Sequence, residues 1–149
     1  IRRQRQMCIR DRFIRDFLEN NITDPIASKR SGRERFVMTS YPQRNVKYPI
    51  ITVKHDGTSD IRRLGMQSES HLVRIPIEIR IWARNEKEKD ELTQEVYNKL
   101  RTNQFGAGSS VEDEGLHDFT VLNIVPVDEP GETGIKSNVM TVQYLYILE

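Results

Sequence analysis

The sequence has a single cysteine, Cys8, so it can form neither an internal disulfide framework nor a cysteine-based zinc site. No apolar run approaches the roughly 18 to 20 residues that a membrane-spanning helix needs. The chain also lacks the G-x-S-x-G, Walker A and dinucleotide-binding motifs, so no common catalytic class is indicated. Hydrophobic residues make up 36% and charged residues 30%, which predicts a small core, a large hydrated surface and room for further burial in an assembly.

The first twelve residues differ from the rest of the chain. The stretch Met7 to Arg12 resembles the translation of a sequencing adapter, a peptide that recurs at the ends of environmental gene fragments. The alternative is a native basic arm. Residues 1–12 hold five arginines and one aspartate, so residues 13–149 carry 18 basic and 21 acidic residues, a net charge of −3. The sequence pI of 8.1 therefore gives no independent support for nucleic-acid binding.

The clearest pattern is a strand that leads directly into a helix. The odd positions from Val73 to Ala83 are apolar, whereas most of the even positions are polar, which predicts one buried and one hydrated strand face. Asn85 and Glu88 have the spacing of a helix N-terminal capping box. Leu92, Val96 and Leu100 then recur at four-residue intervals, so the helix and the strand should share one core.

The other segments complete an α+β fold for residues 13–149, taken as a single domain. We predict about five strands in a mixed or antiparallel sheet with two helices, in the order α-β-β-β-α-β-β. The expected elements are a helix over 13–22, strands over 35–41, 48–55 and 71–83, a helix over 85–102, and strands over 119–127 and 138–148.

Three finer expectations concern the sheet and its connections. Residues 58–70 should form a long hairpin or flap after the turn signal Asp56-Gly57. Pro76 removes a backbone donor, which predicts a sheet edge or a bulge. Residues 138–148 are apolar on both faces and should lie centrally in the sheet. Residues 103–117 are long for a connection in a compact domain, and we expect them to be mobile or ordered by a partner.

Candidate site residues are few. The three histidines, His55, His71 and His117, lack a metal-ligand spacing, so neither a metal nor a cofactor is expected. An interaction surface is indicated by basic and aromatic residues on and beside the central strand, which could stack on and pair with nucleic acid. The alternative is that arginine stems cover the tryptophan or that the face meets another subunit. The candidate residues are Arg62, Arg63, Arg74, Arg80, Trp82 and Arg84.

The order of elements also indicates a family. Tyr48 to Val53, the strand Val73 to Ala83 passing directly into the Asn85 helix, and the final pair of strands together resemble the tail terminator (tail completion) proteins of long-tailed phages. The resemblance covers about residues 13–149, and it rests on architecture more than on particular residues.

The resemblance implies a function that composition does not. Members of that family are virion structural proteins and not enzymes; they form rings, typically hexamers, that cap the tail tube and join it to the head. The implied partners are further copies of the chain, the tail tube protein and the head–tail connector proteins, with no membrane. A small sheet-surface nucleic-acid binder and a small hydrolase with a dispersed site remain as alternatives.

Overall fold

The computed structural model describes residues 2–30, 35–39, 47–55, 59–63, 71–102, 117–128 and 134–148. Its elements, in chain order, are α1 (Arg2–Asn21), the short 3-10 helix η1 (Ala27–Lys29), β1 (Val37–Met38), β2 (Ile50–His55), β3 (Ser59–Arg63), β4 (His71–Ala83), α2 (Glu86–Thr102), β5 (His117–Asp128) and β6 (Lys136–Leu148).

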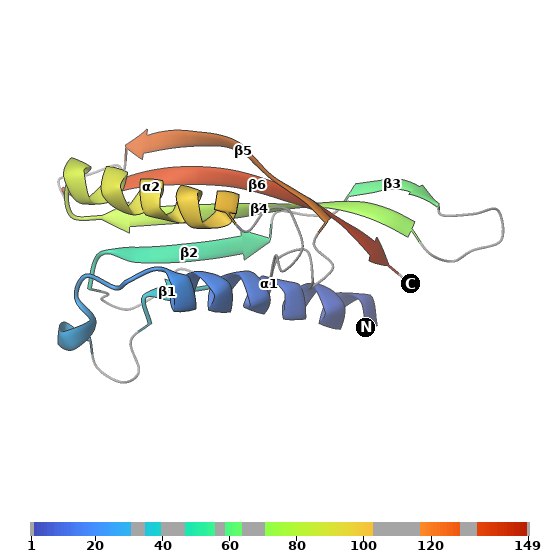
Figure 1. Cartoon of the computed structure of the whole chain (residues 1–149), viewed down its shortest axis with the longest axis horizontal. Coiled ribbons are helices and arrows are strands. Elements are labelled where there is room, and N and C mark those ends of the chain that lie inside the picture. Colours follow the sequence, from blue (N-terminus) through green and yellow to red (C-terminus); the bar gives the residue numbers. More distant parts are fainter. Residues whose placement is uncertain are drawn as a thin grey trace.

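One mixed sheet organises the molecule (Figure 1). Its main strand order is β1-β2-β4-β6-β5, and β3 pairs with β4 in addition. The β1–β2 pair is parallel and all other pairs are antiparallel. The predicted α+β class, the two helices and the five-strand path are therefore confirmed, and β6 lies between β4 and β5 as its two apolar faces indicated.

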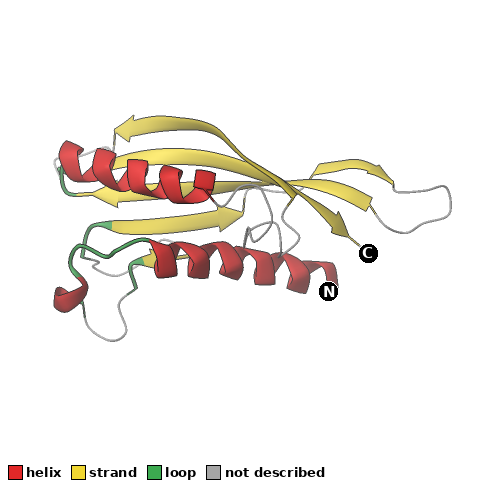
Figure 2. Ribbon diagram, in the orientation of Figure 1, coloured by secondary structure: helices red, strands yellow, loops and turns green. Residues whose placement is uncertain are grey.

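Both helices cover the same face of the sheet, which we call the helix face (Figure 2). Helix α1 packs on β1 and β2, and α2 packs on β4 and β6. The predicted alternation of β4 is confirmed, since all of its odd-numbered residues from Val73 to Ala83 are buried. Apolar residues of the two helices and of β2, β4 and β6 form one continuous core on this face. The even-numbered residues of β4 lie on the other face, called here the opposite face.

The start of α2 is fixed by both its cap and its core contacts. Asn85 Oδ1 accepts a 2.8 Å hydrogen bond from the Glu88 backbone N–H, which confirms the predicted N-cap. Farther along, the buried Asn138 of β6 donates a 2.8 Å hydrogen bond to Thr93 Oγ1. A buried polar pair of this kind fixes the register of the helix on the sheet, because a shift would leave the buried Asn138 side-chain N–H without its acceptor.

Strand β4 changes partner near Pro76. On the side away from β6, it pairs with β2 from Trp82 to Ile77 and with β3 from Arg74 to His71. Residues 56–58, which join β2 to β3 opposite this point, lie outside the described residues, so the sheet edge or bulge predicted at Pro76 stays a prediction. On the other side of Pro76 the β4–β6 register is continuous without a bulge.

The long hairpin or flap predicted over 58–70 contains the strand β3, which is absent from the predicted order of elements. Strands β2 and β3 both run antiparallel to β4 on the same side, so together with β4 they form one long hairpin. Asp56-Gly57 and the segment 103–116 lie outside the described residues. The strand predicted over 35–41 was too long, since β1 spans only Val37–Met38.

Helix α1 continues across the boundary predicted at Phe13. Its side chains are described from Arg12 onward, and the apolar face predicted from Ile14, Phe17 and Leu18 is buried. Among the described residues, no helix combines the length and apolar character that crossing a bilayer requires.

Deleting residues 1–12 is expected to leave the melting temperature unchanged within error. The reasons are that residues 1–12 resemble a translated adapter and differ in charge from the rest of the chain, and that the described core contacts of α1 begin at Phe13. Thermal unfolding followed by circular dichroism compares the full chain with a protein that starts at Phe13. A clear fall in melting temperature would show that the segment is native structure.

Candidate interaction surfaces

The predicted basic surface is only partly assembled. Arg74, Arg80 and Trp82 share the opposite face of β4, as their even positions require. The Arg80 guanidinium lies over the Trp82 ring at 4.1 Å from its centroid, and Trp82 Nε1 donates a 3.2 Å hydrogen bond to Thr52 Oγ1. The tryptophan is therefore held in the structure on one ring face and at its N–H. This arrangement matches the alternative in which an arginine covers the tryptophan.

The remaining members lie elsewhere. Arg84 follows the end of β4, and its Nη2 lies 2.6 Å from Glu88 Oε2 on α2. In β3, Arg62 is the register partner of Leu72, and Arg63 is the register partner of His71. The backbone positions of the six residues are consequently spread over the strand face, the start of the helix and the hairpin, and among those with described side chains Arg84 is paired with Glu88.

The histidines are not brought together into a metal site. His55 ends β2, His71 begins β4, and His117 begins β5. Within the described residues, no group of three or more histidine, cysteine, aspartate or glutamate side chains could hold a metal ion.

The Arg84–Glu88 pair joins β4 to the first turn of α2. Glu88 Oε1 accepts hydrogen bonds from the Arg84 backbone N–H and Nε, both at 3.2 Å. The hydrogen bonds from the Arg84 side chain hold the pKa of the Glu88 carboxyl below its ordinary value. Glu88 therefore binds Arg84 in place of the Asn85 backbone N–H that a full capping box would use.

Replacing Arg84 with Met should raise the pKa of Glu88. Because the folded-state pKa is lowered in the native protein, the stabilisation is present above the unfolded pKa of about 4.3 and is lost as the pH falls through the folded pKa. The melting temperatures of the native and Arg84→Met proteins should therefore differ at pH 7 and converge in acid. Two-dimensional NMR titration of the Glu88 carboxyl checks the shift. An unchanged Glu88 pKa in the variant would contradict the assigned cause.

A buried arginine joins three segments beside α1. Arg30 Nε lies 2.6 Å from Asp24 Oδ2, Nη1 donates a 2.8 Å bond to the Lys47 carbonyl, and Nη2 donates to the Pro49 carbonyl. Its guanidinium also lies 5.5 Å from the centroid of the Phe36 ring. The side chain is only 5% exposed. Arg30 thus fixes the segment after α1 to the start of β2.

An acidic hollow of about 280 Å³ lies between Pro25 and the first turns of α2. Its carboxylates already serve local structure: Glu88 binds Arg84, and Glu95 Oε1 accepts a long, 3.5 Å bond from the Thr23 backbone N–H. The other lining residues are Asn85, Lys87, Glu91 and Leu92.

Strand β5 carries three of the four large hydrophobic residues that are exposed in the described part of the chain. It ends the strand order of the sheet, and no described strand pairs with its outer side. Five consecutive residues, Leu122 to Pro126, are exposed, so apolar groups reach solvent on both faces of the strand. Leu122 is 49%, Val125 47% and Ile124 38% exposed. Exposed apolar surface that is contiguous in this way makes β5 a candidate interaction surface.

The sequence predicted the position of this strand, but we did not predict from it that the apolar residues of the strand are exposed. The available signal was the stretch from Val121 to Val127, which has no charged residue and is apolar at both odd and even positions. A strand buried on one side alternates, so apolar residues on both sides indicate either a central strand or an edge strand with a partner. No family model matches the chain, and no curated protein is similar to it at a significant level.

Proposed function

We propose that the chain is a virion structural protein that forms a ring on the end of a phage tail tube and joins the tube to the head. The observation that carries the proposal is the exposed apolar strand β5 at the end of the sheet. A chain with a modest core and an uncovered apolar edge gains stability by burying that edge in an assembly.

The order of elements adds support. Helix, hairpin, capped helix and final strand pair follow the order that led to the resemblance to tail terminator proteins. The proposed role is mechanical, with no catalytic step, and its partners are further copies of the chain, the tail tube protein and the head–tail connector proteins.

The nucleic-acid alternative has weaker support. The Trp82 ring that a base would stack on is already covered on one face by Arg80. On the same face the acidic Glu78 lies between the arginines and opposite Lys54 in the register with β2, which reduces the local positive charge.

The test measures mass and binding on one preparation. Sedimentation velocity over a hundredfold concentration range should show a ring-sized species, or a monomer that binds the ends of purified tail tubes in electron micrographs. Titration with single-stranded DNA and RNA at low and physiological salt serves as the comparison. The proposal would be overturned by a protein that stays monomeric, does not bind the ends of tail tubes, and binds nucleic acid with a steep salt dependence.

A further inference from the structure

We propose that copies of the chain associate head to tail, with the outer edge of β5 in one copy adding to the outer edge of β1 in the next. This inference rests on the proposed function, because it names the two surfaces that would build the ring. It commits to a second copy of this chain as the partner of the exposed strand.

The first argument is topological. Strands β1 and β5 are the two ends of the main strand order, so joining them continues the sheet from one copy into the next. Contacts between two different surfaces are heterologous, and they close into a ring when the rotation between copies permits.

Strand direction fits the same arrangement. Strand β5 is antiparallel to β6, β6 to β4 and β4 to β2, whereas β1 is parallel to β2. Hence β1 and β5 run in opposite directions in one chain. If neighbouring copies are related by rotation about an axis parallel to the strands, the strands of each copy keep their directions. Strand β5 of one copy then meets β1 of the next in antiparallel orientation, which is the more stable pairing.

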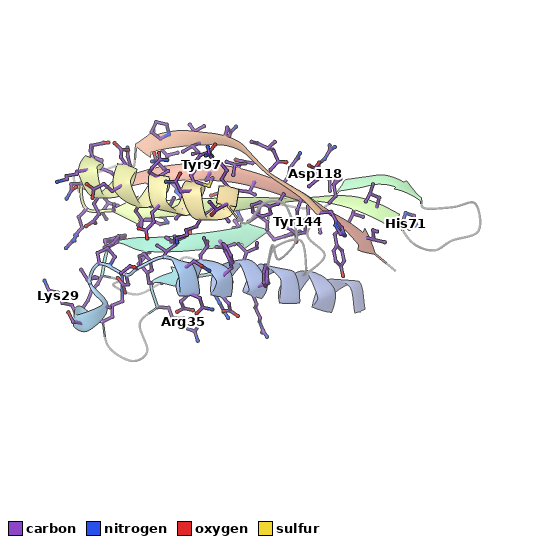
Figure 3. All side chains as sticks on the ribbon, viewed as in Figure 1. Lys29, Arg35, His71, Tyr97, Asp118 and Tyr144 are labelled. Carbon is purple, nitrogen blue, oxygen red and sulfur yellow. The ribbon has the colours of Figure 1, made fainter. Side chains whose placement is uncertain are left out.

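Charge favours this pairing over a pairing of β5 with itself. The uncharged residues 119–127 are flanked by Asp118 and Asp128. A two-fold β5–β5 contact centred on Asn123 would place Asp118 of each copy opposite Asp128 of the other, and like charges directly opposite are destabilising. At the β1 edge, by contrast, the cation Arg35 precedes the strand, where Figure 3 labels it. Its Nη1 lies 3.8 Å from Glu19 Oε2, and its side chain is still 56% exposed, so the guanidinium can also meet a carboxylate of a second copy.

Placing Asp128 beside Arg35 fixes a register that agrees with the two strand faces. Antiparallel pairing then puts Val125 beside Met38. Both residues lie on the opposite face, because Val125 pairs with Val139 and Met38 with Thr52, the partner of Arg80. Cross-strand neighbours must share a face, and this register meets that condition.

The arrangement also covers apolar surface that α2 leaves open. Ile124 lies on the helix face as the partner of Met140, yet it is 38% exposed, and the main packing of α2 is on β4 and β6. In the neighbouring copy, α1 packs over β1 and β2. The head-to-tail contact would bring that helix beside Ile124.

Disulfide formation between single-cysteine variants tests the contact. In a Cys8→Ser background, Met38→Cys and Val125→Cys proteins are oxidised alone and as a mixture, on tail tubes as well as in solution. The mixture should give a covalent dimer, neither variant alone should do so, and the double variant should give a ladder of covalent oligomers. The control is Lys87→Cys, because the Lys87 side chain on α2 is 85% exposed. It measures how much disulfide forms by random collision.

Each other outcome overturns the inference. A dimer from Val125→Cys alone would show a two-fold β5 contact. A ring without disulfides in the mixture would place the contact elsewhere while leaving the proposed function intact. If the protein assembled neither in solution nor on tail tubes, the result would contradict the proposed function as well as this contact.

Discussion

Ile79→Asp should leave the protein unfolded at 25 °C. Ile79 is fully buried on the helix face of β4, where its register partners are Val53 and Met140. An unpaired carboxylate at such a site costs several kcal/mol, whereas a domain of this size has a free energy of unfolding of only about 5 to 15 kcal/mol. Loss of dispersed amide signals in an NMR spectrum checks the result.

Two variants control for the position and for the charge. Ile79→Val removes one methyl group and should cost about 0.5 to 1.5 kcal/mol. Arg74→Asp places the same new carboxylate on the exposed opposite face of β4 and should fold. A folded Ile79→Asp protein would mean that the two faces of β4 are inverted.

Arg30→Ala should lower the free energy of unfolding by about 3 to 5 kcal/mol, the usual cost of breaking a buried ion pair from one side. The substitution removes the partner of the Asp24 carboxylate, which is 15% exposed, and the donors to the Lys47 and Pro49 carbonyls. Urea denaturation measures the change.

The matched variant is Arg30→Lys, which keeps the charge but has no planar group to reach three acceptors at once. It should recover only part of the lost stability. Full recovery would show that charge alone holds the segment, and an unaffected Arg30→Ala protein would show that the network contributes nothing.

The predictions that held rest on local patterns. The alternation along β4 fixes its faces because neighbouring residues of a strand point to opposite sides. The Asn85 cap was readable because its acceptor and donor lie three residues apart. The central place of β6 followed from its apolar residues on both faces.

The features that were missed depend on distant contacts. Arg30 lies in the polar stretch 27–34, whose composition is typical of a surface loop, and its acceptors at Lys47 and Pro49 lie 17 and 19 residues away. Nothing in its immediate neighbourhood indicates burial. In the same way, the predicted order of elements has no strand at β3, because its strand character comes from pairing with β4 and not from its polar sequence.

For the candidate surface, too, the local pattern was predicted and the contacts between side chains were not. Alternation correctly put Arg74, Arg80 and Trp82 on one face, yet it could not show that Arg80 stacks on Trp82. Arg84 and Glu88 are four residues apart, a spacing that permits an ion pair. The sequence pattern instead predicted that Glu88 would complete a capping box with Asn85.

The central position of β6 has a consequence for the order of folding. Its ladder with β4 joins residues about 50 to 80 positions apart, and closing such long loops is slow and entropically costly. While a chain is being synthesised, β4 and β5 are complete before β6 exists, so each has an unpaired edge toward the missing strand. The nascent chain therefore carries its greatest aggregation risk just before β6 emerges, and the sheet closes from its centre as the last described strand arrives.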